Sequence, residues 1–147
     1  MASLTYKVVA KVPPDKAFQY VADIKRHAEW GMDDMKVDPV TGGPTKVGSR
    51  FNAVGHLLGK PNPSTVTVTA YEPPRRLAFD AEDKSTIFLH EFRFTPQNGG
   101  TLIERELTGK KRPVVQAILF PLFKGAIDKN FNGAMAKLKE RLESDTP

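Results

Sequence analysis

The sequence predicts an α+β domain in which one long C-terminal helix lies against one large antiparallel sheet. Apolar residues recur at steps of three or four through residues 114–142, which indicates a helix with one inward stripe. Residues 35–108 before it are typical of strands separated by short connections, and such strands pair antiparallel with their neighbours. One helix on one sheet encloses apolar space, which is either filled by side chains or left open for a ligand.

The first part of the chain predicts one strand and two short helices. Residues 4–12 are rich in Val, Tyr and Thr and alternate loosely, as strands do. Pro14 and Asp15 suit the first turn of a helix, where proline has no orphan N–H and a carboxylate complements the helix dipole. Asp23 is placed to cap a second short helix that ends near residue 29.

Six further strands follow, each bounded by turn residues. The clearest alternation is Thr-Val-Thr-Val-Thr at residues 65–69, and the strongest hairpin signal is Gln-Asn-Gly-Gly at residues 97–100, expected to form a four-residue loop. The expected strands cover residues 35–40, 49–58, 64–71, 77–81, 85–95 and 101–108.

Pro121 stands inside the long helical pattern. A proline in a helix interior costs about 3 kcal/mol and kinks the axis. Two interpretations stay open: the helix bends at Pro121, or regular helix begins there and residues 114–120 form a separate turn.

Length and composition limit the class of protein. The 147 residues suit a single domain, residues 1–147. The chain has no cysteine, which excludes disulfides, thiol nucleophiles and cysteine zinc sites. No signal peptide and no transmembrane segment of ~20 apolar residues is recognisable, so we expect a cytoplasmic protein.

The net charge of +5 indicates either a solvated basic surface or an anionic partner. The densest basic cluster is Lys110, Lys111 and Arg112. It has no interleaved aromatic residues, so we expect no nucleic-acid partner. A membrane or protein surface is the alternative role for these cations.

Several short stretches, taken together and in this order, resemble a known family. They are Pro-Pro-Asp-Lys-Ala-Phe-Gln-Tyr-Val-Ala-Asp from Pro13, then Trp30, Val-Gly-Ser-Arg-Phe from Val47, Tyr-Glu-Pro-Pro-Arg-Arg-Leu from Tyr71, Phe-Arg-Phe from Phe92, Gly-Thr from Gly100, and the long helix. The combination resembles the START-like or SRPBCC superfamily, and within it the polyketide cyclase/dehydrase group.

The resemblance implies a Bet v 1-like helix-grip fold. In that fold a strongly curved seven-stranded antiparallel sheet wraps around the C-terminal helix, and a deep apolar cavity lies between them. Members bind lipids, sterols, polyketides or other hydrophobic molecules, and some are cyclases or aromatases. The fold therefore implies a cavity rather than a particular reaction.

The last predicted hairpin carries the chain's best polar constellation. Glu91 and Arg93 should face water, so alternation turns Phe88, His90, Phe92 and Phe94 toward the helix. The same argument on the partner strand turns Ile103, Arg105 and Leu107 inward, with His90 about one rung from Arg105.

Arg105 and His90 are the candidate catalytic residues. A buried Arg needs a partner, and the candidates are Asp128, an anionic ligand or water in the cavity. One interpretation places Arg105 at a solvated rim, and the other has Arg105 and His90 orient a carboxylate, carbonyl or phenolic oxygen of a ligand. His90 is the best general acid or base in the chain, because its unperturbed pKa lies near neutrality.

We expect the ligand-binding wall to combine these two groups with aromatic and aliphatic residues. The candidates are Trp30, Phe51, Tyr71, Phe79, Phe88, His90, Phe92, Ile103, Arg105, Phe120, Phe123 and Ile127. The three histidines are widely spaced, so no metal site is expected, and no cofactor either.

The sequence therefore predicts a binding protein for a hydrophobic small molecule, such as a lipid, polyketide or aromatic compound, in a cavity between sheet and helix. The alternative is an enzyme of the polyketide cyclase, aromatase or dehydratase type acting in the same cavity. A third hypothesis is a membrane-surface or protein-interaction role for the basic residues. Both a monomer and a homodimer are compatible with the sequence.

Overall fold

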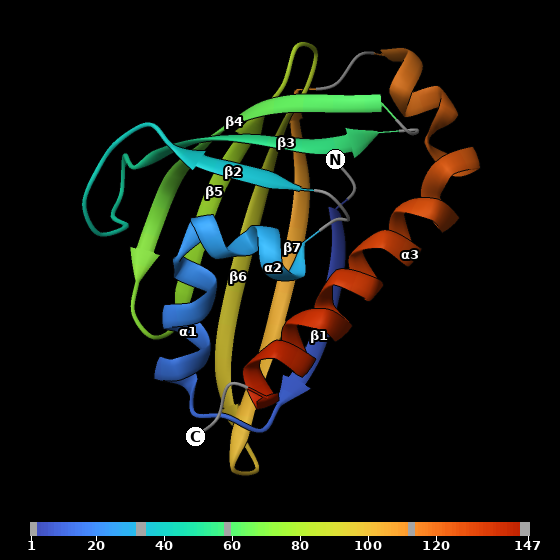
Figure 1. Cartoon of the computed structure of the whole chain (residues 1–147). Coiled ribbons are helices and arrows are strands. Elements are labelled where there is room, and N and C mark those ends of the chain that lie inside the picture. The colour runs from blue at the N-terminus through green and yellow to red at the C-terminus, as the bar shows by residue number, and fades with distance from the viewer. Residues whose placement is uncertain (1–2, 32–34, 58–59, 112–113, 145–147) are drawn as a thin grey trace.

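A computed structural model describes residues 3–31, 35–57, 60–111 and 114–144. All seven expected strands and the expected helices are present, so the predicted α+β architecture is confirmed (Figure 1). The elements are β1 (Ser3–Ala10), α1 (Pro14–Ala22), η1 (Ile24–Arg26), α2 (His27–Trp30), β2 (Lys36–Pro39), β3 (Arg50–Leu57), β4 (Lys60–Glu72), β5 (Arg76–Glu82), β6 (Ile87–Gln97), β7 (Gly100–Lys111) and α3 (Val114–Ser144).

The strands form one antiparallel sheet in the order β1-β7-β6-β5-β4-β3-β2. Strands β2 to β7 follow one another as a meander, and β7 also pairs with β1, the first strand of the chain. The sheet is strongly curved, so that β2, β3 and β4 cross over the end of β5, β6 and β7 (Figure 1). All three α-helices lie on its concave side, as the helix-grip fold implies.

The β6–β7 hairpin sets the register of the inner wall. Gln97 pairs with Gly100, so the loop has two residues rather than the expected four. Asn98 and Gly99 adopt positive φ angles of 47° and 78°, which a tight hairpin turn of this length requires. Phe92 consequently lies opposite Arg105, and His90 opposite Leu107, which keeps the predicted inward and outward faces.

Two strands are longer than expected. β7 continues through Gly109 to Lys111, and a register shift between Ile87 and Phe88 accommodates the extra residues. β4 begins at Lys60 although prolines follow at once. β5 ends opposite Thr65, so residues 60–64 have one free edge, where the missing N–H of a proline is tolerated.

The second helix also differs from expectation. A 3₁₀ turn over Ile24–Arg26 precedes the short helix α2, and the side chain of Asp23 makes no capping hydrogen bond. Asp23 therefore occupies the expected N-cap position, but its side chain does not cap the helix. The chain instead bends twice in quick succession, which brings His27 and Trp30 onto the same buried face.

α3 passes through Pro121 without interruption. A separate turn before Pro121 is therefore not observed, and Figure 1 shows the first turns of α3 bent away from the line of the rest. The inward stripe holds only in the C-terminal half, where Ala134, Met135, Leu138 and Leu142 are buried. Phe123, which belongs to the predicted stripe, is 39% exposed, so the stripe was wrong at this position. The reason is geometric: toward its N-terminal end α3 diverges from the sheet (Figure 1).

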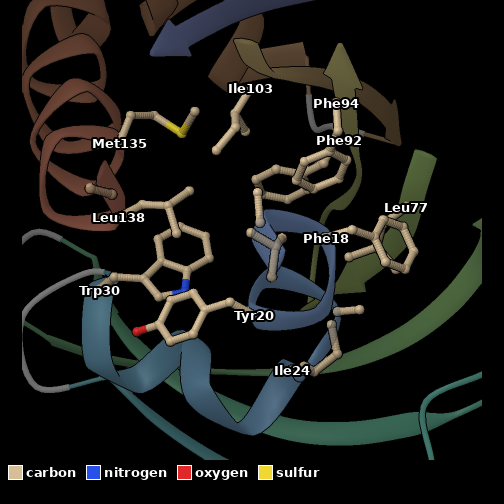
Figure 2. Close-up of a cluster of buried hydrophobic side chains, with 14 of the residues drawn as sticks. Phe18, Tyr20, Ile24, Trp30, Leu77, Phe92, Phe94, Ile103, Met135 and Leu138 are labelled. Atoms are coloured by element: carbon tan, nitrogen blue, oxygen red, sulfur yellow. The ribbon is translucent and has the colours of Figure 1, made fainter. Parts of the chain in front are cut away.

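The core lies where α1, α2 and the C-terminal half of α3 meet the sheet. Figure 2 shows Met135 pointing toward Ile103 of the sheet and Leu138 pointing toward Trp30 of α2. Phe18 of α1 packs edge-on against Phe94, with 5.4 Å between ring centroids. This core holds one end of the molecule together and leaves the space nearer the start of α3 for a pocket.

Candidate functional site

An inner pocket of about 180 Å³ lies between the helices and the concave face of the sheet. η1 and α2 contribute Ile24, His27 and Trp30 to its wall, and α3 contributes Phe131 and Ala134. From the sheet come mainly apolar side chains and two basic ones: Ala53, Val66, Phe79, Ala81, His90 and Arg105.

Arg105 is the charged group of this pocket, and it is only 8% exposed. The guanidinium carbon lies 4.7 Å from the ring centroid of Phe131, 5.0 Å from that of Phe92 and 5.7 Å from that of Trp30. Each contact is a cation–π interaction worth about 0.5–2 kcal/mol. The rim position considered for Arg105 is wrong, because packing of α2 and α3 over the sheet covers this side chain.

Arg105 has no carboxylate partner within the described residues. Its Nη2 donates to Nδ1 of His90 across 3.0 Å, and its buried Nε has no hydrogen-bond partner there. Asp128, the proposed partner, instead accepts from the Tyr6 hydroxyl at 2.7 Å and from Lys124 at 2.7 Å. Burial lowers the pKa of Arg105 to about 9, which is still above neutrality, so the group stays charged.

His90 is neutral for a structural reason. Its ring stacks on Phe79 with 4.8 Å between centroids, and its Nδ1 accepts from Arg105, so the proton of the neutral ring is on Nε2. Burial, the Arg105 charge and His27 together hold the pKa of His90 well below its usual value. The predicted meeting of His90 and Arg105 on one wall is observed, with Arg105 donating to a neutral imidazole.

His27 is a third polar group of the pocket, and the sequence argument missed it. Its Nε2 donates to the carbonyl oxygen of Val21 at 2.7 Å, and its ring lies 4.8 Å from that of Trp30. Burial is the main cause that lowers its pKa to about 4, so it is neutral at pH 7. The signal in the sequence was the spacing of Ile24, His27 and Trp30, three residues apart on one helical face.

The other expected wall residues are distributed more widely. Trp30, Phe79, His90 and Arg105 border the inner pocket. Phe92 and Ile103 are fully buried in the core beside it. Phe88 and Ile127 are half-buried away from its lining, Phe123 is exposed, and the side chain of Phe120 is outside the described part of the structure.

Phe51 and Tyr71 border a different, more open hollow on the outer side of α1. This hollow has a volume of about 390 Å³ and is shared with the β2–β3 connection, including Gly43 and Thr45. Phe51 is buried, but the curvature of the sheet carries it past the inner pocket. Sheet curvature is a tertiary property, and the alternation of side chains along one strand gives no information about it.

One residue of the expected basic cluster is engaged in an ion pair. Lys110 donates to Asp80 Oδ2 at 2.8 Å, Lys111 is exposed, and Arg112 lies outside the described residues. Among the residues that the structure describes, no three His, Asp or Glu side chains gather into a metal-binding group. No helix in those ranges is long and apolar enough to cross a membrane.

Comparison with known proteins gives one family and many similar folds. Residues 1–143 match the model of the family described as polyketide cyclase / dehydrase and lipid transport. No curated protein matches the sequence.

Solved structures of similar fold have little sequence in common with the chain. TTHA0849 from Thermus thermophilus superposes with a TM-score of 0.82 at 16% identity, over 99% of this chain and 100% of that one. A START superfamily protein from Mycobacterium smegmatis gives 0.80 at 12% identity, over 98% and 99%. The Zhui aromatase/cyclase from a Streptomyces species gives 0.74 at 12% identity, over 97% and 93%. At these identities the likeness shows the helix-grip fold alone.

Proposed function

The chain belongs to the polyketide cyclase/dehydrase and lipid-transport family, and from that premise we propose that it binds a small hydrophobic molecule in the inner pocket. The ligand carries an acidic or carbonyl oxygen, which Arg105 and His90 hold against the sheet. The remaining wall is mainly apolar and aromatic, which suits a ligand bound mainly by burial of its hydrocarbon surface.

The observation that carries this proposal is the isolated charge of Arg105. Removing a guanidinium from water costs several kcal/mol even after relaxation, and the three aromatic contacts offset part of that cost. No carboxylate within the described residues completes the pair. A group that lowers stability in the empty protein and borders a pocket is best explained by a ligand that pairs with it.

The two basic side chains present complementary donors. Arg105 has guanidinium N–H groups that no described residue engages, and His90 carries its proton on Nε2. A ligand oxygen that accepts from the guanidinium forms a charge-assisted hydrogen bond, and such bonds are about twice as strong as neutral ones. The Nε2–H of His90 leaves the ring edge opposite Arg105 and is a donor for a second ligand oxygen.

An enzymatic role of the cyclase, aromatase or dehydratase type is the second candidate, and the neutral His90 is what favours it. A neutral imidazole held by Arg105 can exchange a proton with a bound carbonyl compound through Nε2. The size of the pocket weighs against a long substrate, because sites for larger organic ligands measure about 300–1,000 Å³. We therefore rank binding first.

The test is calorimetric titration with benzoate, a small apolar anion. We expect the wild type to bind it and Arg105→Met to bind at least tenfold more weakly, because the methionine retains the volume and loses the charge. Arg105→Met should also be at least as stable as the wild type, since an apolar replacement of a buried charge is often neutral or stabilising.

Arg93→Met is the matched control. Arg93 lies on the neighbouring strand, is half-exposed and pairs with Glu91 and Glu106, so its loss should leave benzoate affinity unchanged. Equal affinity in wild type and Arg105→Met, or no binding of benzoate or decanoate to any variant, would contradict the proposal. Mass spectrometry of wild-type and His90→Gln mixtures with β-keto thioesters tests the enzymatic alternative, which requires product in the wild type alone.

A further inference from the structure

We propose that the ligand is a single aromatic ring that bears both a carboxylate and a hydroxyl group, and that His27 is the residue that recognises the hydroxyl. This inference rests on the proposed function and adds to it the size of the ligand and a second polar group. Three observations on the inner pocket carry it: its volume, the flat side chains of its wall and the orientation of the His27 ring.

The volume limits the ligand to one ring. A cavity of about 150 Å³ accommodates benzene, and the inner pocket measures about 180 Å³. A benzene ring with two small polar substituents matches this space. A fused tricycle or an extended acyl chain exceeds it.

The wall is shaped for a flat molecule. Phe79 and the ring of His90 are nearly parallel, with an interplanar angle of 11°. Trp30 and Phe131 present further aromatic surface on the helical side. Aromatic pairs prefer offset or edge-on geometries that gain about 0.5–1.5 kcal/mol beyond burial, so such a wall favours an aromatic ring over an aliphatic chain of equal volume.

His27 offers the ligand a hydrogen-bond acceptor, which Arg105 and His90 do not. Because its Nε2 donates to the Val21 carbonyl, the neutral ring has its lone pair on Nδ1. That atom has no hydrogen-bond partner among the described residues. Arg105 and His90 Nε2 are donors. A ligand with a carboxylate alone satisfies the donors and leaves Nδ1 unpaired, whereas a hydroxyl group donates to it.

Three other polar side chains border the pocket, and none replaces His27. The buried indole N–H of Trp30 has no hydrogen-bond partner among the described residues, but it can only donate. Asn62 and Ser64 lie on β4 and are only half-buried, and the Asn62 amide donates to Asp83 Oδ2 at 3.2 Å. His27 is 4% exposed. A buried acceptor discriminates more strongly than one that water reaches, because an unpaired buried group has lost its solvation.

The experiment compares a panel of small probes by calorimetric titration of the full chain. It contains the three hydroxybenzoate isomers, benzoate, methyl 4-hydroxybenzoate, decanoate and anthracene-2-carboxylate. We expect at least one hydroxybenzoate isomer to bind tenfold or more tightly than benzoate, and the methyl ester, decanoate and the tricyclic acid to bind more weakly than that isomer. In His27→Phe the advantage of the hydroxybenzoate isomer over benzoate should fall to twofold or less.

If the His27→Phe variant fails to fold, a second measurement on the wild type still tests the role of His27. In the wild type labelled with ¹⁵N on histidine, the Nδ1 resonance of His27 should move on adding the preferred isomer and stay in place on adding benzoate. Benzoate that binds as tightly as every hydroxy acid, or an unmoved Nδ1 resonance, overturns the role of His27. Tighter binding of decanoate or the tricycle overturns the size assignment and leaves the proposed function standing. Failure of every probe overturns both.

Discussion

At the scale of single residues, three basic side chains border the inner pocket, and no acidic side chain of the described residues lines it. Arg105 keeps its charge, and that charge is one reason why His90 and His27 stay neutral. Each of the three has one satisfied contact: Arg105 with His90, and His27 with Val21. The polar atoms left over are those that a ligand can engage. A pocket of this kind is electrostatically incomplete when empty.

The buried His27 should make the protein sensitive to acid. Its pKa in the folded state is about 4, below the value of about 6.5 for an unfolded chain. Between these values the unfolded chain binds more protons, so the free energy of unfolding falls as the pH decreases from about 6.5 to 4. At 1.36 kcal/mol per pKa unit, this amounts to about 3 kcal/mol.

His27→Gln tests this contribution. Urea denaturation at pH 7 and pH 4.5 should show a smaller loss of stability in the variant than in the wild type, by about 2–3 kcal/mol. The difference reports the loss of His27 together with its effect on His90, whose pKa His27 helps to lower. Parallel losses in the two proteins would show that His27 is not buried in its neutral form.

At the scale of elements, α3 consists of two halves with different roles. The C-terminal half buries Leu138 and Leu142 against the core. In the N-terminal half Leu122 and Phe123 are exposed, and the contact with β1 is a hydrogen bond from Tyr6 to Asp128. The C-terminal half anchors the helix and also supplies Phe131 and Ala134 to the inner pocket.

Two matched leucine truncations should separate these halves. Leu138→Ala removes a side chain with no exposed surface and should lower the free energy of unfolding by about 2–5 kcal/mol. Leu122→Ala acts on a solvated side chain and should change it by less than about 0.5 kcal/mol. Chemical denaturation measures both. A large loss in Leu122→Ala would mean that the N-terminal half of α3 packs on the sheet in solution.

At the scale of the whole molecule, the curved sheet and α3 meet at one end and separate toward the other. The inner pocket lies between these two layers, which the common core joins. A ligand that contacts Phe79 on the sheet and Phe131 on α3 joins the layers. Binding should therefore stabilise the folded state as a whole.

The expected gain can be calculated from linkage. Benzoate at a hundredfold excess over its Kd should add about 2.7 kcal/mol to the free energy of unfolding, which corresponds to a rise in Tm of about 5–10 °C for a domain of this size. A thermal scan with and without benzoate measures the shift. Arg105→Met at the same benzoate concentration should gain much less, and an equal gain would place benzoate elsewhere.

The sequence alone determined the strands, their order along the chain and the inward direction of His90, Phe92 and Arg105. Side chains alternate strictly along a strand, and Asn98-Gly99 set the hairpin register, so these features follow from neighbours in sequence. Periodicity also predicted the C-terminal helix, whereas only the structure shows that it runs without interruption through Pro121.

Tertiary structure alone decided which inward side chains reach a pocket. Phe51 points inward but sheet curvature carries it elsewhere, Phe123 lies on the apolar stripe but no opposing layer covers it, and His27 became a pocket residue when α2 packed on the sheet. The physical reason is that periodicity specifies a direction within one element. Burial also needs a second surface at the right distance, and that surface comes from residues far away in the chain.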